Sequence, residues 1–119
     1  MLLFSRLGNW RSLVRVLLDE CVPRRVRAEL VEHAVLTVVD MGWSGIKNGQ
    51  LLAKAAIQFD CFLTVDKNLQ FQQAPSELPI AVLVIHAVNN KFETLKPLIQ
   101  QVREVPLVIQ PRELRRIGA

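Results

Sequence analysis

The chain of 119 residues offers little material for a disulfide scaffold, a zinc cluster or a membrane span. Its two cysteines, Cys21 and Cys61, lie far apart in the sequence, and there is no CxxC spacing. His33 and His86 are isolated from both cysteines, so we expect free thiols and structural histidines rather than a zinc site. A bilayer-spanning helix needs about 20 consecutive apolar residues, and the sequence has no such run. These absences predict a cytoplasmic protein without a membrane partner.

What the chain does have is a large apolar fraction and a moderate positive charge. Half of its residues are hydrophobic, which is enough to build a core, and its length fits one domain. A net charge of +4 permits contact with a phosphate backbone but does not require it, because charge clusters also occur as solvated helix faces. The arginines cluster in three places: Arg24, Arg25 and Arg27; Arg112, Arg115 and Arg116; and the N-terminal extension.

The first 13 residues contain Arg6 and Arg11 but no acid, and Leu3, Leu7 and Trp10 recur at helical spacing. This composition fits a short helical extension, a start codon assigned too early, or a transit peptide. An amphipathic extension could pack on a partner or on a second subunit, so a homodimer is one expected assembly. We therefore expect an N-terminal extension over residues 1–13, a domain over 14–110 and a basic C-terminal tail over 111–119.

Short apolar runs alternate with amphipathic segments along the domain, which predicts strands alternating with helices. We expect strands at Val14–Leu18, Ala34–Val39, Cys61–Val65, Ile80–Ile85 and Leu107–Ile109, and helices at Val22–Glu32, Asn48–Phe59, Lys67–Gln73 and Lys91–Arg103. Pro97 should weaken the last of these helices and kink it. This order predicts an α/β fold with a mainly parallel sheet of about five strands and right-handed crossovers.

Two aspartates, Asp19 and Asp66, each follow a short apolar run that is expected to be a buried strand. In an open parallel sheet, ligands collect just outside the carboxyl ends of the strands. Two carboxylates there can share a Mg²⁺ ion, which keeps several waters and needs only one or two carboxylates from the protein. The alternative is that each Asp caps the helix that follows it.

Three segments resemble, in order, the motifs of a family of small PIN-like proteins. The run LLDECVP at residues 17–23 resembles the LLDExxP motif that opens the family. TVVDMG at residues 37–42 resembles its TVxDxG motif, and LTVDKN at residues 63–68 resembles its LxTxDxD motif. No single motif is specific, but the three together in the right order are fairly specific. The resemblance covers the chain from about Val14 to Ile109.

This resemblance implies a three-layer α/β/α PIN-like fold and a metal-dependent ribonuclease, often the toxin of a toxin–antitoxin pair neutralised by a small antitoxin protein. It implies Mg²⁺ or Mn²⁺ as cofactor and RNA as substrate. Asp19 and Asp66 match the positions that carry metal and catalysis, and Asp40 is a third candidate for the metal site. The basic residues that we expect to contact RNA are Arg24, Arg25 and Lys67.

The sequence departs from the family pattern at three positions where acids are expected. Asn48 and Gln50 are neutral amides at the start of the helix after the second strand, and Asn68 replaces the second acid of the third motif. An amide oxygen can ligate a hard cation but brings no charge and cannot act as a base. A catalytically inactive PIN-like protein that binds RNA or a protein partner is therefore the main alternative.

A receiver domain is a second alternative, because there too acids end the first strand and a phosphoacceptor Asp ends the third. That fold also needs a Ser or Thr at the end of the fourth strand and a Lys at the end of the fifth. The chain offers His86 and Ala87, and then Gln110 and Pro111, at the expected positions.

Overall fold

The computed structural model describes residues 14–30, 33–69 and 77–118. The N-terminal extension expected over residues 1–13 lies outside the described residues. In chain order, the elements are β1 (Arg15–Leu18), α1 (Arg25–Glu29), β2 (Ala34–Thr37), α2 (Asn48–Gln58), β3 (Cys61–Thr64), β4 (Ala81–His86), α4 (Phe92–Leu95), η4 (Lys96–Leu98), α5 (Ile99–Glu104), η5 (Val105–Leu107) and β5 (Leu114–Gly118).

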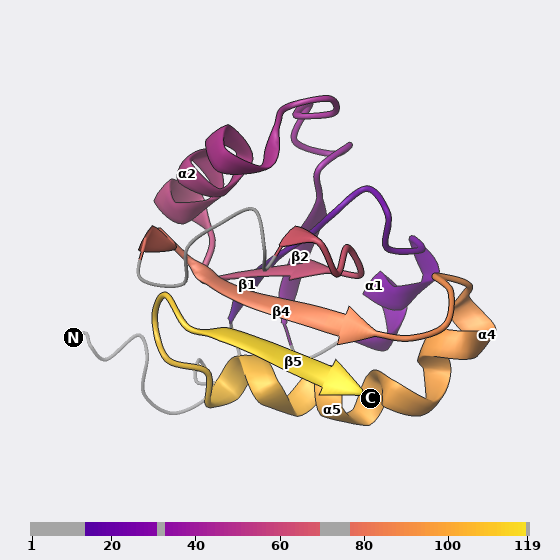
Figure 1. The fold of residues 1–119 in the computed structure, drawn as a ribbon. Coiled ribbons are helices and arrows are strands. Elements are labelled where there is room, and N and C mark those ends of the chain that lie inside the picture. Colours follow the sequence, from indigo (N-terminus) through magenta and orange to yellow (C-terminus); the bar gives the residue numbers. More distant parts are fainter. Residues whose placement is uncertain (1–13, 31–32, 70–76, 119) are drawn as a thin grey trace.

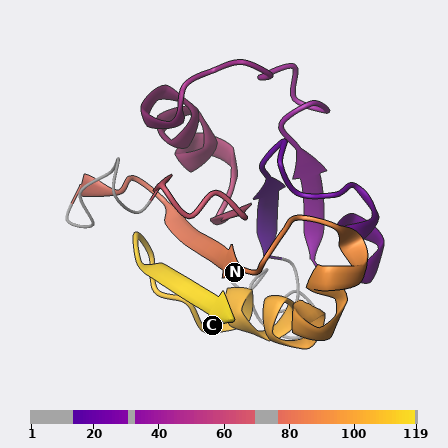
Figure 2. The same cartoon turned by 45° about the vertical axis from the view of Figure 1, so that its right-hand side comes forward.

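The five strands form one sheet in the order β2-β1-β3-β4-β5, and every neighbouring pair is parallel. The predicted α/β class, with a mainly parallel sheet of about five strands, is confirmed. Figure 2 shows β2 and β5 at opposite ends of the sheet. The chain runs outward from β1 to β2 and then crosses to β3 on the other side of β1, so the sheet has its topological switch point between β1 and β3.

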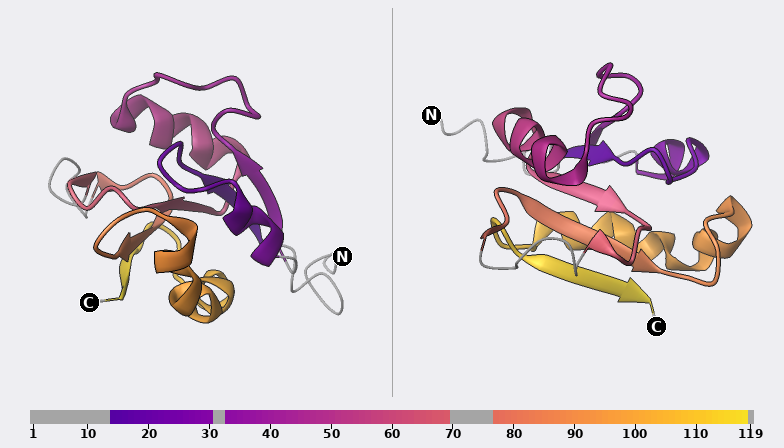
Figure 3. Two further views of the ribbon diagram at one scale, coloured as in Figure 1. Left: turned by 90° about the vertical axis from the view of Figure 1, so that its right-hand side faces the viewer. Right: turned by 45° about the horizontal axis from the view of Figure 1, so that its top comes forward.

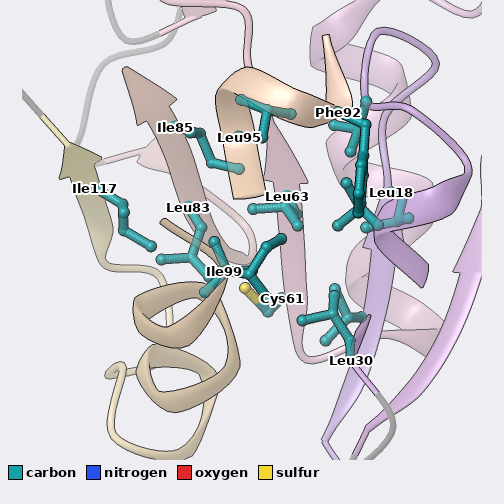
Figure 4. Packing of buried hydrophobic residues seen from close by; sticks show 14 of the residues in the cluster. Leu18, Leu30, Cys61, Leu63, Leu83, Ile85, Phe92, Leu95, Ile99 and Ile117 are labelled. Carbon is teal, nitrogen blue, oxygen red and sulfur yellow. The ribbon is translucent and has the colours of Figure 1, made fainter. Parts of the chain in front are cut away.

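Helices cover both faces of this sheet, and the side-chain alternation of the strands assigns a cluster of core residues to each face. In Figure 1, α2 lies on one side of the sheet and α5 on the other. The α2 face is filled by Leu17, Leu51, Leu52, Ala55, Phe62, Val82 and Val84, among others. The opposite face, shown in Figure 4, contains Leu18, Leu30, Leu63, Leu83, Ile85, Leu95 and Ile99, among others. Strands buried on both faces explain the uninterrupted apolar runs of β3 and β4.

The last strand lies elsewhere than predicted. Residues Leu107–Ile109 do not form a strand, because Val105–Leu107 is a 3₁₀ helix with Pro106 near its start. The expected basic tail instead contributes β5, Leu114–Gly118, which pairs with β4. The apolar signal of β5 is weak, since only Ile117 of its residues is buried. Gly118 ends the strand at φ +94°, and a Cβ there would lie 2.4 Å from the His86 carbonyl oxygen.

The observed helices lie near the predicted positions, but several are shorter than predicted. Helix α1 is limited to Arg25–Glu29, and residues 31–32 of the predicted helix lie outside the described residues. The predicted weak point at Pro97 is confirmed, because α4 gives way to the 3₁₀ helix η4 there before α5 begins. Most of the predicted Lys67–Gln73 helix also lies outside the described part of the chain. No helix in that part is long and apolar enough to cross a membrane.

Candidate functional site

A polar cleft of about 680 Å³ lies beyond the carboxyl ends of β1, β3 and β4. Figure 3 shows these ends on one edge of the sheet, where the strand arrows point. The first turn of α2 and the loop between β4 and α4 form its other walls. Among the predicted site residues, the cleft is lined by Asp19, Asp66, Lys67, Asn48 and Asn68. It also contains Glu20, Cys21, Asn89 and Asn90.

The Thr64 hydroxyl connects the two aspartates of this cleft. Its Oγ1 donates to Asp19 Oδ2 at 2.7 Å and accepts the Asp66 backbone N–H at 3.0 Å. Thr64 is the last residue of β3 and is fully buried, so one hydroxyl fixes the ends of two adjacent strands. The pair of strands that carries the aspartates is the pair that flanks the switch point, where doubly wound sheets bind their ligands.

The Asp19 carboxylate accepts hydrogen bonds at both oxygens. Oδ1 accepts the Glu20 N–H at 2.8 Å, and Oδ2 accepts the Cys21 thiol at 3.4 Å in addition to Thr64. Burial raises the pKa of Cys21 most, its hydrogen-bond contact with the Thr64 hydroxyl lowers it, and the negative charge of Asp19 raises it again. The thiol therefore remains protonated at neutral pH and acts as a donor that orients Asp19. Helix α1 has no side-chain cap, so Asp19 does not serve as its N-cap.

Asp66 has a turn-forming contact as well as its place in the cleft. Its Oδ1 accepts the Asn68 N–H at 3.0 Å, and its carbonyl accepts the Leu69 N–H at 3.2 Å. The contact closes a turn, and most of the helix that Asp66 was expected to cap lies outside the described residues. This contact fixes the carboxylate beside the cleft, and a carboxylate can accept further ligands at its remaining lone pairs.

Asp40, the third predicted metal residue, is not brought to the other two. It follows β2 at the edge of the sheet, and it is absent from the lining of the cleft. Its Oδ2 accepts the Thr37 N–H at 2.9 Å and forms an ion pair with Arg27 from α1. The Thr37 hydroxyl in turn accepts the Asp40 N–H at 2.9 Å. Asp40 thus completes the turn after β2 and pairs with a local arginine.

Few possible metal ligands come together in the cleft. Among the described residues there is no group of three or more His, Cys, Asp or Glu side chains that could hold a metal ion. Asp19 and Asp66 line one cleft and are linked through Thr64, and two carboxylates are enough for an ion that keeps several waters. Two carboxylates are therefore available in the cleft for one hard cation, and the described residues offer no larger group of acids for a two-metal cluster.

The other predicted residues are divided between the cleft and distant surfaces. Lys67 lines the cleft. Arg24 and Arg25 belong to the start of α1 and do not line it, and the Arg25 guanidinium lies 4.1 Å from the centre of the Phe92 ring and 3.6 Å from Glu93. Gln50 is exposed in the first turn of α2 and is also absent from the lining.

Several residues that line the cleft, or that bond to residues lining it, were not predicted from the sequence. Thr64 precedes Asp66 in the third motif, and its position at the end of a buried strand was the available signal. Asn89 and Asn90 lie three and four residues after the end of β4, and Asn90 Nδ2 donates to the Cys21 carbonyl at 2.9 Å. The apolar Ala87 and Val88 separate these amides from the strand, so the rule that identified Asp19, a polar residue just after an apolar run, does not select them.

Comparisons with known proteins give no match to a family model, to a curated protein or to a solved structure. The strand order is that of flavodoxin-like sheets, which receiver domains share. However, β4 ends at His86 and is followed by Ala87, and β5 ends at Gly118. The Ser or Thr and the Lys that a receiver needs at these two ends are thus missing.

Proposed function

We propose that this protein is a Mg²⁺- or Mn²⁺-dependent endoribonuclease of PIN-like type with a reduced, two-carboxylate active site. Its cellular role, by the same resemblance, is that of a toxin controlled by a small antitoxin protein. The observation that supports the proposal is the buried Thr64 hydroxyl, which links Asp19 to the Asp66 backbone; both aspartates line the polar cleft at the switch point of the sheet.

Asp19 and Asp66 would hold the metal ion, which supplies an activated water and neutralises charge on the leaving oxygen. Thr64 and the Cys21 thiol orient the Asp19 carboxylate through their hydrogen bonds, and the backbone N–H of Asn68 orients Asp66. Lys67 lies on the wall of the same cleft and can attract the phosphate of the substrate. The neutral amides at Asn48 and Asn68 add no negative charge, so we expect slow turnover.

The direct test is cleavage of single-stranded RNA in millimolar Mn²⁺ by the wild type and by Asp66→Asn. The matched control is Asp60→Asn, because Asp60 immediately precedes the strand that Asp66 follows and pairs with Arg15 instead. We expect Asp66→Asn and EDTA to reduce cleavage to background and Asp60→Asn to retain it. A wild-type rate that neither EDTA nor Asp66→Asn changes would refute the nuclease assignment.

A non-catalytic binding protein is the second candidate, and one observation favours it. Both Asp19 oxygens already accept hydrogen bonds from the chain itself, which satisfies the carboxylate without an ion. A ligand that binds only the native state raises the melting temperature. No shift of the wild-type melting temperature in millimolar Mn²⁺, together with tight RNA binding, would favour the binding protein.

A further inference from the structure

The carboxyl edge of the sheet is divided by charge. The aspartates lie after β1 and β3, whereas three basic residues lie close enough to interact electrostatically: Lys67 after β3, His86 at the end of β4 and Arg116 in β5. Lys67 directly follows Asp66 and lines the cleft, and His86 ends β4 next to Ala87, which also lines it. Lys67 is thus in the cleft and His86 is next in sequence to a residue that lines it, whereas Arg116 is not among the lining residues.

The strand register places His86 and Arg116 on the same face of the sheet. In the β4–β5 pair, Val84 is opposite Arg116 and His86 is opposite Gly118, so His86 and Arg116 are diagonal neighbours. Val82 and Val84 face α2, and by alternation His86 does so too. Leu114 packs against the same α2-face cluster, which puts Arg116 on that face as well.

These basic groups have no acidic partner of their own. The Lys67 and Arg116 side chains are exposed, and neither forms an ion pair with any described residue. By contrast, Arg115 lies on the opposite face of β5 and donates to Glu113 at 2.8 Å. Like charges held together without a counterion repel one another, so this corner is suited to a bound anion.

The pKa of His86 is sensitive to the positive charges of Lys67 and Arg116. Burial lowers the pKa of its imidazole most, and the positive charges of Arg116 and Lys67 lower it further, with no carboxylate among the contributing groups. Its Nε2 is shielded from solvent and has no hydrogen-bond partner among the described residues. The imidazole is therefore neutral at neutral pH, and an arriving anion would offset the two cations and favour its protonation.

We propose that Lys67, His86 and Arg116 form a phosphate subsite that holds the RNA phosphodiester adjacent to the one positioned at Asp19 and Asp66. This inference rests on the proposed ribonuclease function and adds the position and direction of the substrate. The RNA strand would cross the carboxyl edge of the sheet from β1 toward β5. Lys67 and Arg116 make the charge contacts, and His86 takes up a proton as the phosphate binds.

The test is the affinity of a fluorescent single-stranded RNA oligonucleotide, measured by anisotropy in EDTA so that no cleavage occurs. Arg116→Gln should weaken binding several-fold and reduce the salt slope by about 0.7, the value for one phosphate contact on a single strand. Arg115→Gln removes the same charge from the same strand on the other face and should have little effect. Arg116→Lys should retain most of the affinity, which separates loss of charge from loss of folding.

The pH dependence provides a second readout. Wild-type affinity should increase as the pH falls from about 8 to about 6, because phosphate binding raises the pKa of His86. His86→Gln should remove most of this increase. Equal losses in Arg116→Gln and Arg115→Gln, or wild type that binds an acidic peptide but not RNA, would overturn the subsite.

Failure of the nuclease proposal can be distinguished from failure of the phosphate subsite. Binding in EDTA does not depend on catalysis, and Asp66→Asn tests cleavage without touching Arg116. A protein that binds RNA through Arg116 but never cleaves it would retain the subsite and lose the nuclease assignment.

Discussion

Three aspartates follow three adjacent strands of this sheet, and their surroundings differ. Asp19 and Asp66, after β1 and β3, line the polar cleft and are linked by the buried Thr64 hydroxyl. Asp40, after β2, bonds to the Thr37 N–H and pairs with Arg27. The ends of β2 and β3 each have a Thr that accepts the N–H of the following Asp, yet only Thr64 also donates to a second Asp. Although β1 neighbours both β2 and β3, only the Asp after β3 lines a cleft together with Asp19, so an acid on a neighbouring strand is not enough by itself to make a candidate site.

The largest expected effect separates the two kinds of aspartate directly. Asp19→Asn should lower RNA cleavage by about 100-fold or more, because loss of a metal ligand removes several kcal/mol of charge stabilisation. It should also abolish the rise in melting temperature caused by millimolar Mn²⁺. Asp40→Asn is the control and should leave both the cleavage rate and the Mn²⁺ response unchanged. Equal responses in the two variants would remove the distinction between the strand ends.

The two threonines allow a finer comparison. Thr64→Val removes the donor to Asp19 and leaves the partly buried Asp66 N–H without its acceptor, which should cost about 1–3 kcal/mol of unfolding free energy. Cleavage should fall by about 10- to 100-fold, as for residues that orient metal ligands. Thr37→Val removes only the bond to the Asp40 N–H and should cost about 1 kcal/mol without changing the Mn²⁺ response. Urea unfolding and the cleavage rate measure both effects.

The sequence predicted the sheet, and the position of two candidate site residues at its edge, where apolar runs and the polar residues after them formed a clear pattern. Long buried runs such as Ile80–Ile85 identified the parallel sheet, and the polar residues just beyond two such runs identified Asp19 and Asp66. Strand β5 was missed because it is an edge strand with two arginines and one fully buried side chain, so its pattern resembles a basic tail. A short apolar segment, Leu107–Ile109, competed with it and forms part of a 3₁₀ turn after Pro106.

Sequence patterns could not predict that Asp40 lies outside the cleft and pairs with Arg27. Its motif position gave no information about strand order, and β2 is separated from β3 by β1. Its pairing with Arg27 depends on how α1 packs over the sheet, which is a tertiary contact. The role of Thr64 had the same origin, because only the register of β1 against β3 brings its hydroxyl to Asp19.

Adding acids to the cleft should increase the difference in function between the cleft aspartates and Asp40. We expect the triple variant Asn48→Asp, Gln50→Glu and Asn68→Asp to increase Mn²⁺-dependent cleavage by about tenfold, since each added carboxylate favours cation binding. Most of the gain should come from positions 48 and 68, because Asn48 and Asn68 line the cleft and Gln50 does not. Single variants assayed over a Mn²⁺ titration test this order. A gain confined to Gln50→Glu would contradict the assigned geometry.

The smallest expected effect concerns the ion pair that holds Asp40. Both partners are partly exposed, with 39% of the Arg27 and 27% of the Asp40 side-chain surface accessible, so their coupling should be about 1 kcal/mol or less and should weaken with salt. A double-mutant cycle of Arg27→Ala and Asp40→Asn, measured by urea unfolding, gives this coupling. Arg27→Ala also frees the Asp40 carboxylate. Since β2 places Asp40 outside the cleft, this variant should show the same Mn²⁺ response as wild type. If Arg27→Ala instead showed a larger Mn²⁺ response, and Asp40→Asn then removed the increase, Arg27 would normally keep Asp40 from acting as a third metal ligand. The difference between the strand ends would then depend on one ion pair rather than on strand order.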